Sequence, residues 1–238
     1  MNAARTPRVK ICCIASAEEA ALAVGAGASA LGLVSRMPSG PGVISDELIT
    51  SIAATVPPGI GTFLLTSRQS VEQIVEQHHF CRTNTIQICD HLVRGTHREL
   101  KDALPGISIV QVVHVTGPES VEEAVAVAPH VDAILLDSGN QKLTVKELGG
   151  TGQMHDWTLS REIRERVSVP LFLAGGLTPE NVEQAIAEVG PFGLDVCSGV
   201  RTDGKLDAEK LGRFFAAVRA RNPHLTSCKD WETGGVSR

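Results

Sequence analysis

The chain has 238 residues, of which 42% are hydrophobic, 21% charged and 3% aromatic, and its formal net charge is −5 at pH 7. This composition is typical of a globular protein, and the absence of tyrosine together with the negative charge argues against nucleic-acid binding, which needs stacking rings or a basic surface. No apolar run reaches the roughly 18–20 residues that cross a bilayer, and the first residues lack the apolar stretch of a signal peptide, so we expect a cytoplasmic protein that does not bind membranes.

One unit recurs along the chain: a short apolar or β-branched run, then a capping residue, then a helical pattern. The predicted strands are 9–14, 30–35, 61–66, 85–89, 107–115, 133–137, 169–174 and 193–198. The predicted helices are 16–26, 45–56, 70–81, 96–104, 119–128, 157–167, 179–189 and 207–220. Alternation of strands and helices predicts a parallel sheet. Eight such units favour a closed (β/α)8 TIM barrel over an open doubly wound sheet, and the Gly-rich dinucleotide fingerprint is absent after the first strand.

The barrel is expected to form a single domain over residues 9–220. Residues 1–8 precede it as an N-terminal tail, and the polar, aperiodic residues 221–238 follow it as a C-terminal tail. No linker rich in Pro, Gly or Ser divides the chain.

Several helix ends carry recognisable signals. Ser16 with Glu19, and Ser70 with Gln73, fit the capping-box pattern at helix starts. Thr178 before Pro179 predicts a helix that begins at the proline. Gly27 is a plausible helix stop.

The first strand, "VKICCI", assigns different environments to its two adjacent cysteines. Because side chains alternate along a strand, Val9, Ile11 and Cys13 share one face and Lys10 and Cys12 the other. The outer face of a barrel is apolar, so we expect Cys13 to pack outward and Lys10 and Cys12 to face the lumen. Cys12 then lies near the catalytic end of the barrel, as a thiolate base or nucleophile with Lys10 beside it, or as a small side chain that fills the interior.

The sixth strand, "AILLD", ends in Asp137, which is either a cap at the start of a loop or a catalytic acid. A thiol and a carboxyl group at the same rim of the barrel are the pair that general acid–base catalysis requires. A raised carboxyl pKa and a lowered thiol pKa would let one group donate and the other accept a proton near neutrality, which predicts a bell-shaped pH dependence.

Glycines follow the last two strands, in "LAGGLTPENV" and "DVCSGVRTDGK". Gly175, Gly176, Ser198 and Gly199 favour a phosphate site, because their backbone amides can approach an anion closely and these loops bind phosphate in many barrels. The alternative is a pair of tight turns.

No metal site is expected. The six cysteines form no Cys-x-x-Cys pair, and in the cytoplasm they should stay reduced. His78 and His79 are expected on a solvated helix, with metal binding as the less favoured alternative.

The stretches "VKICCIASAEEAALAVGAGASALGLV", "ILLDS", "GGTGQMHDW", "AGGLTPENV" and "DVCSGVRTDGKLDAEKL" resemble the phosphoribosylanthranilate isomerase family of tryptophan biosynthesis, in the family's order, from about residue 9 to 219. The resemblance implies a barrel that works without cofactor or metal and catalyses an Amadori rearrangement. It also implies that Asp137 is the acid that opens the ribose ring, that Cys12 is the base that removes the C2′ proton, and that amides near Gly176 and Gly199 hold the phosphate.

The chain departs from the family pattern around the expected aromatic half of the substrate. Cys13 replaces a glycine, "SRMPSGPGVIS" has glycine or proline where the family has an arginine, and "QICD" retains Gln87 but has Cys89 for histidine and Asp90 for glycine. The residues expected around the rest of the substrate are Lys10, Arg36, Gln87, Cys89 and Asp195.

Three functions therefore stay open: a phosphoribosylanthranilate isomerase, a related isomerase with a different phosphorylated substrate, and a barrel that binds a phosphorylated metabolite without turnover. The expected partner is a small phosphosugar, and the expected assembly is a monomer or homodimer. The loop 139–156 is either a lid over the site or a surface excursion.

Overall fold

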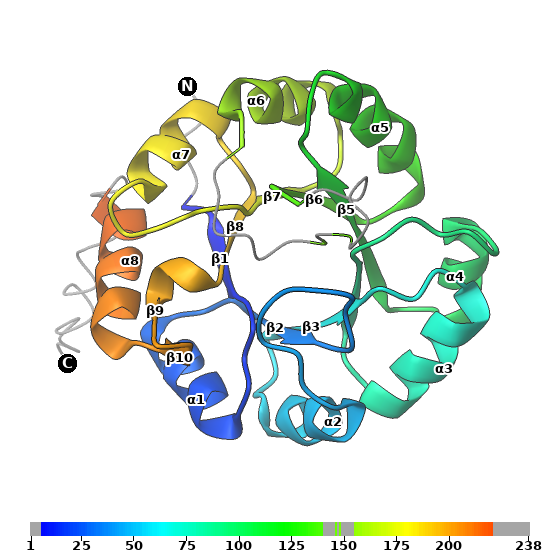
Figure 1. The fold of residues 1–238 in the computed structure, drawn as a ribbon, viewed down its shortest axis with the longest axis horizontal. Coiled ribbons are helices and arrows are strands. Elements are labelled where there is room, and N and C mark those ends of the chain that lie inside the picture. Colours follow the sequence, from blue (N-terminus) through cyan, green and yellow to red (C-terminus); the bar gives the residue numbers. More distant parts are fainter. Residues whose placement is uncertain (1–5, 140–145, 147, 149–154, 221–238) are drawn as a thin grey trace, which may run out of the picture.

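The computed structural model describes residues 6–139, 146, 148 and 155–220, which form a closed ring of parallel strands inside a ring of helices (Figure 1). The strands are β1 (Arg8–Ile11), β2 (Ala30–Val34), β3 (Gly61–Thr66), β4 (Thr85–Ile88), β5 (Ser108–His114), β6 (Ala133–Asp137), β7 (Leu171–Leu173) and β8 (Gly193–Val196). Each strand pairs in parallel with the next, and β8 pairs with β1 to close the barrel. The predicted (β/α)8 TIM barrel is confirmed.

The helices that cover the barrel are α1 (Ala17–Ala26), α2 (Asp46–Thr55), α3 (Val71–Cys81), α4 (His97–Ala103), α5 (Glu119–Val127), α6 (Trp157–Arg166), α7 (Val182–Val189) and α8 (Ala208–Ala220). Short 3₁₀ helices η1 (Ala128–His130) and η2 (Ser198–Val200) follow α5 and β8. A small antiparallel hairpin, β9 (Arg201–Thr202) and β10 (Lys205–Leu206), then leads into α8. Among the described helices, none combines the length and the apolar character that a membrane span requires.

Alternation along the strands divides the apolar residues into two cores. The outer core lies between strands and helices and takes residues such as Val9, Ile11 and Leu194, whereas Phe63, Leu135 and Phe172 belong to an inner core. The inner residues lie one position away from the outer ones because the side-chain period of a strand is two. Residues on the lumen side at strand ends therefore converge at one mouth of the barrel.

Two details of the predicted helix starts are wrong, although Ser70 does lie directly before the first residue of α3. The side chain of Ser70 makes no capping hydrogen bond, and α7 begins at Val182 rather than at Pro179. The residues that precede α7 form a turn instead, in which Asn181 Oδ1 accepts the amide hydrogen of Thr178. Gly27 does end α1, in the left-handed conformation with φ of 111°.

His78 corrects another expectation. It is buried, and its Nε2 lies 2.7 Å from the carbonyl oxygen of Thr83, so it is a core residue of α3, whereas His79 is exposed. In the described part of the chain, no three His, Cys, Asp or Glu side chains are arranged to hold a metal ion. The loop 139–156 lies largely outside the described residues, as do 1–5 and 221–238.

A buried ion pair joins the first and last strands inside the barrel. Lys10 and Asp195 are register partners on β1 and β8, and Lys10 Nζ lies 2.8 Å from Asp195 Oδ2. Lys10 is completely buried, and its ammonium also lies 5.3 Å from the centre of the Phe63 ring. Burial alone would lower the pKa of Lys10, but the Asp195 carboxylate and the nearby thiols outweigh it and raise that pKa, so the lysine stays charged.

We predict that Lys10→Met lowers the free energy of unfolding by about 3–5 kcal/mol, because it leaves the Asp195 carboxylate buried without its cation. Urea unfolding at neutral pH measures this change. The matched control is the double variant Lys10→Met, Asp195→Leu, which removes both charges and should recover most of the loss. A single variant as stable as the parent would contradict the account.

Candidate active site

A pocket opens at the mouth of the barrel, at the C-terminal ends of the strands, and it contains both predicted catalytic side chains. Cys12 lies directly after β1, and Asp137 is the last residue of β6. Both side chains are buried to more than nine-tenths, at 7% and 9% exposure. The pocket is lined by Cys12, Cys13, Val34, Met37, Ser39, Gly40, Pro41, Leu65, Gln87, Cys89, Asp137, Leu148, Ala174, Gly175, Gly176, Leu177, Asp195, Cys197 and Ser198.

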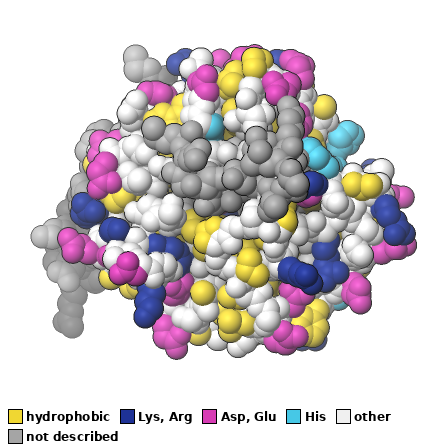
Figure 2. Space-filling model, viewed as in Figure 1, with side chains coloured by type: hydrophobic (Ala, Val, Ile, Leu, Met, Phe, Trp, Pro, Cys, Tyr) yellow, Lys and Arg dark blue, Asp and Glu magenta, His cyan; other side chains and the backbone are white. Residues whose placement is uncertain are grey.

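The surface on this side of the molecule mixes charges of both signs. Figure 2 shows basic and acidic side chains interspersed around the rim and hydrophobic side chains closer to the centre. No broad basic area is visible on this face, so an anionic ligand would have to be held by local donors inside the pocket.

The environment of Asp137 favours its protonated form. Burial raises the pKa of this carboxyl group, and the nearby Asp195 carboxylate adds to the effect. The amide of Ser138, which donates to Asp137 Oδ1 at 2.7 Å, and the neighbouring His114 and Lys10 offset part of the rise, but the pKa stays above its ordinary value of 3.8. A protonated carboxyl group in a pocket can donate a proton.

The environment of Cys12 supplies a positive charge. Lys10 Nζ lies 3.7 Å from Cys12 Sγ, within hydrogen-bond distance for sulfur. Because Asp195 also binds the Lys10 ammonium, the position of this cation relative to the thiol is fixed. A negative charge on this sulfur would therefore have a cation beside it without any rearrangement.

The Cys13 side chain does not pack outward as predicted. β1 ends at Ile11, and Cys13 has a φ of 61°, in the left-handed region that favours glycine. The strand alternation therefore does not reach it, and its thiol turns back into the pocket. Ile14, which strand alternation would place on the same face as Lys10 and Cys12, packs in the outer core for the same reason.

The glycine-bearing loops after β7 and β8 lie against the same pocket. Gly175 and Gly176 have positive φ values of 83° and 63°, a conformation that favours glycine. Because glycine has no side chain, their backbone is open to the pocket. A Cβ atom at Gly199 would lie 1.9 Å from the carbonyl oxygen of Leu177, so only glycine allows η2 to contact the β7–α7 loop. Gly199 itself does not line the pocket, whereas Ser198 does.

The other predicted substrate residues divide into two groups. Gln87, Cys89 and Asp195 line the pocket, and two of their buried oxygens, Gln87 Oε1 and Asp195 Oδ1, have no hydrogen-bond partner among the described residues. Burial raises the pKa of the Cys89 thiol well above its ordinary value, so this group is neutral. Two buried acceptors without partners are positions where ligand donors would be favoured.

Arg36 is not brought to this pocket. Its side chain is exposed and lines a separate depression that also contains Asp46, Arg68 and Lys146. The reason is local: β2 ends at Val34, so strand alternation no longer directs the Arg36 side chain, although Met37 and Pro41 in the same loop do reach the pocket. Among the described residues, no arginine or lysine lines the pocket itself.

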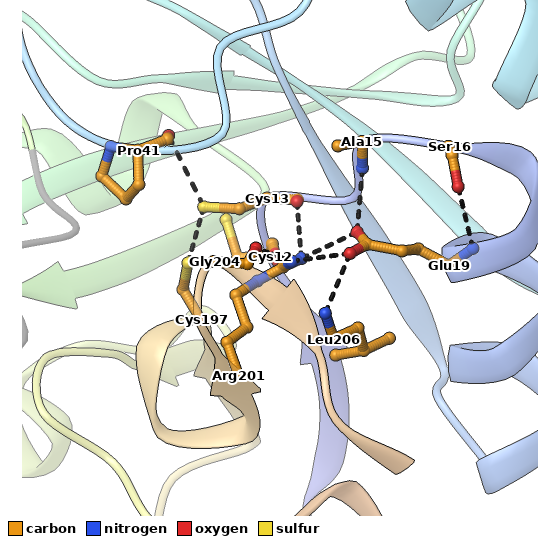
Figure 3. Close-up of polar contacts among 10 residues, drawn as sticks. All are labelled: Cys12, Cys13, Ala15, Ser16, Glu19, Pro41, Cys197, Arg201, Gly204 and Leu206. Atoms are coloured by element: carbon orange, nitrogen blue, oxygen red, sulfur yellow. Dashed lines mark hydrogen bonds and ion pairs between the residues drawn. The ribbon is translucent and has the colours of Figure 1, made fainter.

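Sequence reasoning missed the ion pair that positions the β1–α1 loop. Arg201 donates to the carbonyl oxygens of Cys12 and Cys13 at 3.2 and 2.6 Å, and its guanidinium lies 2.9 Å from Glu19 (Figure 3). The Glu19 carboxylate also accepts the amide hydrogens of Ala15 and Leu206. Glu19 is therefore used for tertiary contacts, while its own amide donates to the Ser16 hydroxyl as predicted.

The chain matches the family model of N-(5′-phosphoribosyl)anthranilate isomerase over residues 9–217. It belongs to this family. A relative from Methanosarcina mazei, N-(5′-phosphoribosyl)anthranilate isomerase 2, is 36% identical over 217 residues, which cover 90% of this chain and 94% of the relative. The resemblance predicted from the sequence motifs is thereby confirmed.

Two solved structures of this family are similar to the chain in fold. A phosphoribosylanthranilate isomerase in complex with reduced 1-(o-carboxyphenylamino)-1-deoxyribulose 5-phosphate is 30% identical, with a TM-score of 0.72, and the match covers 90% of this chain and 99% of that one. Monomers generated from the dimeric isomerase of Thermotoga maritima match at 29% identity over 90% of this chain and 99% of that one, with a TM-score of 0.73.

We predict that Glu19→Gln lowers the free energy of unfolding by about 1–3 kcal/mol, because the largely buried Arg201 guanidinium loses the charged acceptor that balances it. Urea unfolding measures the change. Glu18→Gln is the matched control, because Glu18 is the exposed neighbour on the same helix turn. Equal stability of the two variants would show that the ion pair does not hold the loop.

Proposed function

We propose that this protein catalyses the Amadori rearrangement of N-(5′-phosphoribosyl)anthranilate to 1-(o-carboxyphenylamino)-1-deoxyribulose 5-phosphate in the cytoplasm. The observation that carries the proposal is the presence of a carboxyl group with a raised pKa and a thiol beside a fixed ammonium in one pocket, in a member of the isomerase family. Acid–base chemistry at one sugar needs one donor and one acceptor within the same site.

The first step uses Asp137 as the acid. Its carboxyl group donates a proton to the ribose ring oxygen, the bond between C1′ and that oxygen breaks, and the nitrogen lone pair forms a protonated Schiff base. Because burial raises the pKa of Asp137, its carboxyl group keeps the proton to a higher pH than an exposed aspartic acid would. The carboxylate that results lies near Lys10 and His114, which favour its negative charge.

The second step uses Cys12 as the base. Its thiolate removes the proton from C2′, and the electron pair of that C–H bond moves to form the C1′–C2′ double bond of an enolamine while the Schiff base nitrogen becomes neutral. Protonation at C1′ and loss of the enol proton give the ketose. Lys10 compensates the charge of the thiolate before the transfer.

The remaining contacts follow from the lining of the pocket. The backbone around Gly175, Gly176, Ser198 and Gly199 is proposed to bind the phosphate, because glycines with positive φ leave amides accessible. The partnerless oxygens of Gln87 and Asp195 are proposed to accept hydrogen bonds from the ribose hydroxyls. This arrangement would hold the sugar between its phosphate and the acid–base pair.

A second candidate is a related isomerase that acts on a different phosphorylated N-glycoside. It is favoured by one observation: no arginine or lysine among the described residues lines the pocket, although an anthranilate carboxylate is best bound by such a side chain. Complementation of a tryptophan auxotroph that lacks the isomerase separates the two candidates. Growth supports the first, and absence of growth with folded, expressed protein supports the second.

Assembly as a monomer or a homodimer belongs to the same proposal, since the Thermotoga maritima relative is described as dimeric. Light scattering during size-exclusion chromatography gives the mass directly.

We predict that Cys12→Ser and Asp137→Asn each lower kcat/KM for phosphoribosylanthranilate by about 10²–10⁴-fold, since each removes one proton-transfer group. Cys81→Ala is the control for cysteine replacement, because Cys81 lies on α3 and does not line the pocket. Initial rates, with thermal unfolding to verify folding, measure the effect. Undiminished turnover by either catalytic variant would remove its assigned role.

The pH dependence of kcat/KM should show an alkaline limb. Asp137 must be protonated to act, so activity falls as pH rises through its elevated pKa, and the limb should lie well above 3.8. Steady-state rates from pH 5 to 9 test this, and the residual rate of Asp137→Asn should lack the alkaline limb. A parent profile that is flat at high pH would contradict the role of Asp137 as the acid.

A further inference from the structure

Two cysteines that the proposed mechanism does not use face each other at the pocket wall. Cys13, on the β1–α1 loop, and Cys197, directly after β8, have their sulfur atoms 2.7 Å apart, joined by a hydrogen bond (Figure 3). They are separated by 184 positions in the sequence. A disulfide bond is about 2.05 Å long, so the sulfurs would have to approach by only roughly 0.7 Å to bond.

The two segments that carry these cysteines are held in place by the same side chain. Arg201 follows η2, only four residues after Cys197, and donates to the Cys13 carbonyl oxygen at 2.6 Å. Glu19 on α1 binds the same guanidinium and the amide of Leu206 on β10. The two cysteines therefore face each other from two anchored loops. A bond between their sulfur atoms requires no large movement of the backbone.

The environments of the two thiols differ in a way that suits this reaction. The hydrogen bond between the two sulfurs and the nearby Arg201 guanidinium lower the pKa of Cys197 below its ordinary value, against the effect of burial. The contacts of Cys13 with Cys12 and Cys197, together with burial, raise the pKa of Cys13. Cys197 is thus the thiol that ionises more readily, and Cys13 is the one that retains its proton. Cys197 is also the less buried of the two and lines the open pocket.

We propose that Cys13 and Cys197 form a reversible disulfide when the protein meets a peroxide. The Cys197 thiolate attacks one oxygen of hydrogen peroxide, the O–O bond breaks, and Cys197 becomes a sulfenic acid while hydroxide leaves and is protonated to water. The Cys13 sulfur then attacks the sulfenic sulfur, the S–O bond breaks, and its proton leaves with the hydroxyl group as a second water. In sum, two thiols are oxidised to one disulfide and one peroxide is reduced to two waters. A dithiol reverses the step by thiol–disulfide exchange.

The bond would change the site next to it. Cys13 is adjacent to Cys12, and Cys197 is adjacent to Ser198 of the proposed phosphate loop. Drawing the two sulfurs together displaces both neighbours, so kcat/KM should fall roughly tenfold or more and recover with dithiothreitol. This consequence rests on the proposed isomerase function, whereas the disulfide itself does not.

Peptide mapping tests the disulfide independently of activity. The full-length protein is treated with hydrogen peroxide, remaining thiols are alkylated, and tryptic peptides are analysed without reduction. We expect a cross-link between peptide 11–36, which contains Cys12 and Cys13, and peptide 167–201, which contains Cys197. The cross-link should disappear on treatment with dithiothreitol before alkylation.

Three variants identify the sulfur on peptide 11–36. Cys13→Gly should abolish the cross-link and should fold, because glycine suits the φ of 61° at this position. Cys12→Ser and the remote Cys81→Ala should retain it. A cross-link that persists in Cys13→Gly, a disulfide confined to peptide 11–36, or oxidation of Cys197 to a sulfinic acid with Cys13 unchanged would each overturn the proposal. If the protein forms the cross-link but does not act as an isomerase, the disulfide is still supported and only its predicted effect on turnover is refuted.

Discussion

The ion pair between Lys10 and Asp195 connects the closure of the barrel with the chemistry at its mouth. The two residues are register partners on the first and last strands, so their contact lies where the barrel closes. Complete burial lowers the pKa of a lysine, and the Asp195 carboxylate, with a smaller contribution from the nearby thiols, outweighs this effect and keeps the ammonium protonated. The same ammonium reaches the sulfur of Cys12. A contact that the fold requires therefore also supplies the cation that a thiolate base needs.

The loops around the mouth are positioned by a second charged contact. Arg201 binds the carbonyl oxygens of the two adjacent cysteines and is balanced by Glu19, so the β9–β10 hairpin, the β1–α1 loop and the first turn of α1 form one unit. Gly199 brings η2 against the β7–α7 loop, where a larger residue would collide with the backbone. Preorganisation of this kind lets the site meet its ligand without the cost of ordering loops on binding.

The sequence predicts this fold well because each strand and helix carries its own periodic signal. Within β1 the alternation correctly separates Val9 and Ile11 from Lys10, since successive side chains of a strand point to opposite faces. The same rule fails at Cys13, because the strand has ended and the backbone has turned into a left-handed conformation.

The features that sequence reasoning missed depend on contacts between distant residues. Arg201 and Glu19 are 182 positions apart, and no local sequence pattern predicts their contact. Cys197 offered a usable signal, because it follows β8 directly and lies two residues after Asp195, which also lines the pocket. Arg36 lies beyond the end of β2, where strand alternation no longer sets the direction of a side chain, so its position could not be predicted from residue type alone.

The central claim is that burial raises the pKa of the Asp137 carboxyl group, in a pocket that also contains a thiol whose cation is already in place. Carbon-13 NMR titration of the aspartate carboxyl groups, with Asp137→Asn used to assign the resonance, measures this protonation in the free protein. The account predicts that Asp137 titrates clearly above the ordinary value of 3.8. Titration at or below that value would mean that the carboxyl group is ionised throughout the neutral range, and the assignment of Asp137 as the acid would be wrong.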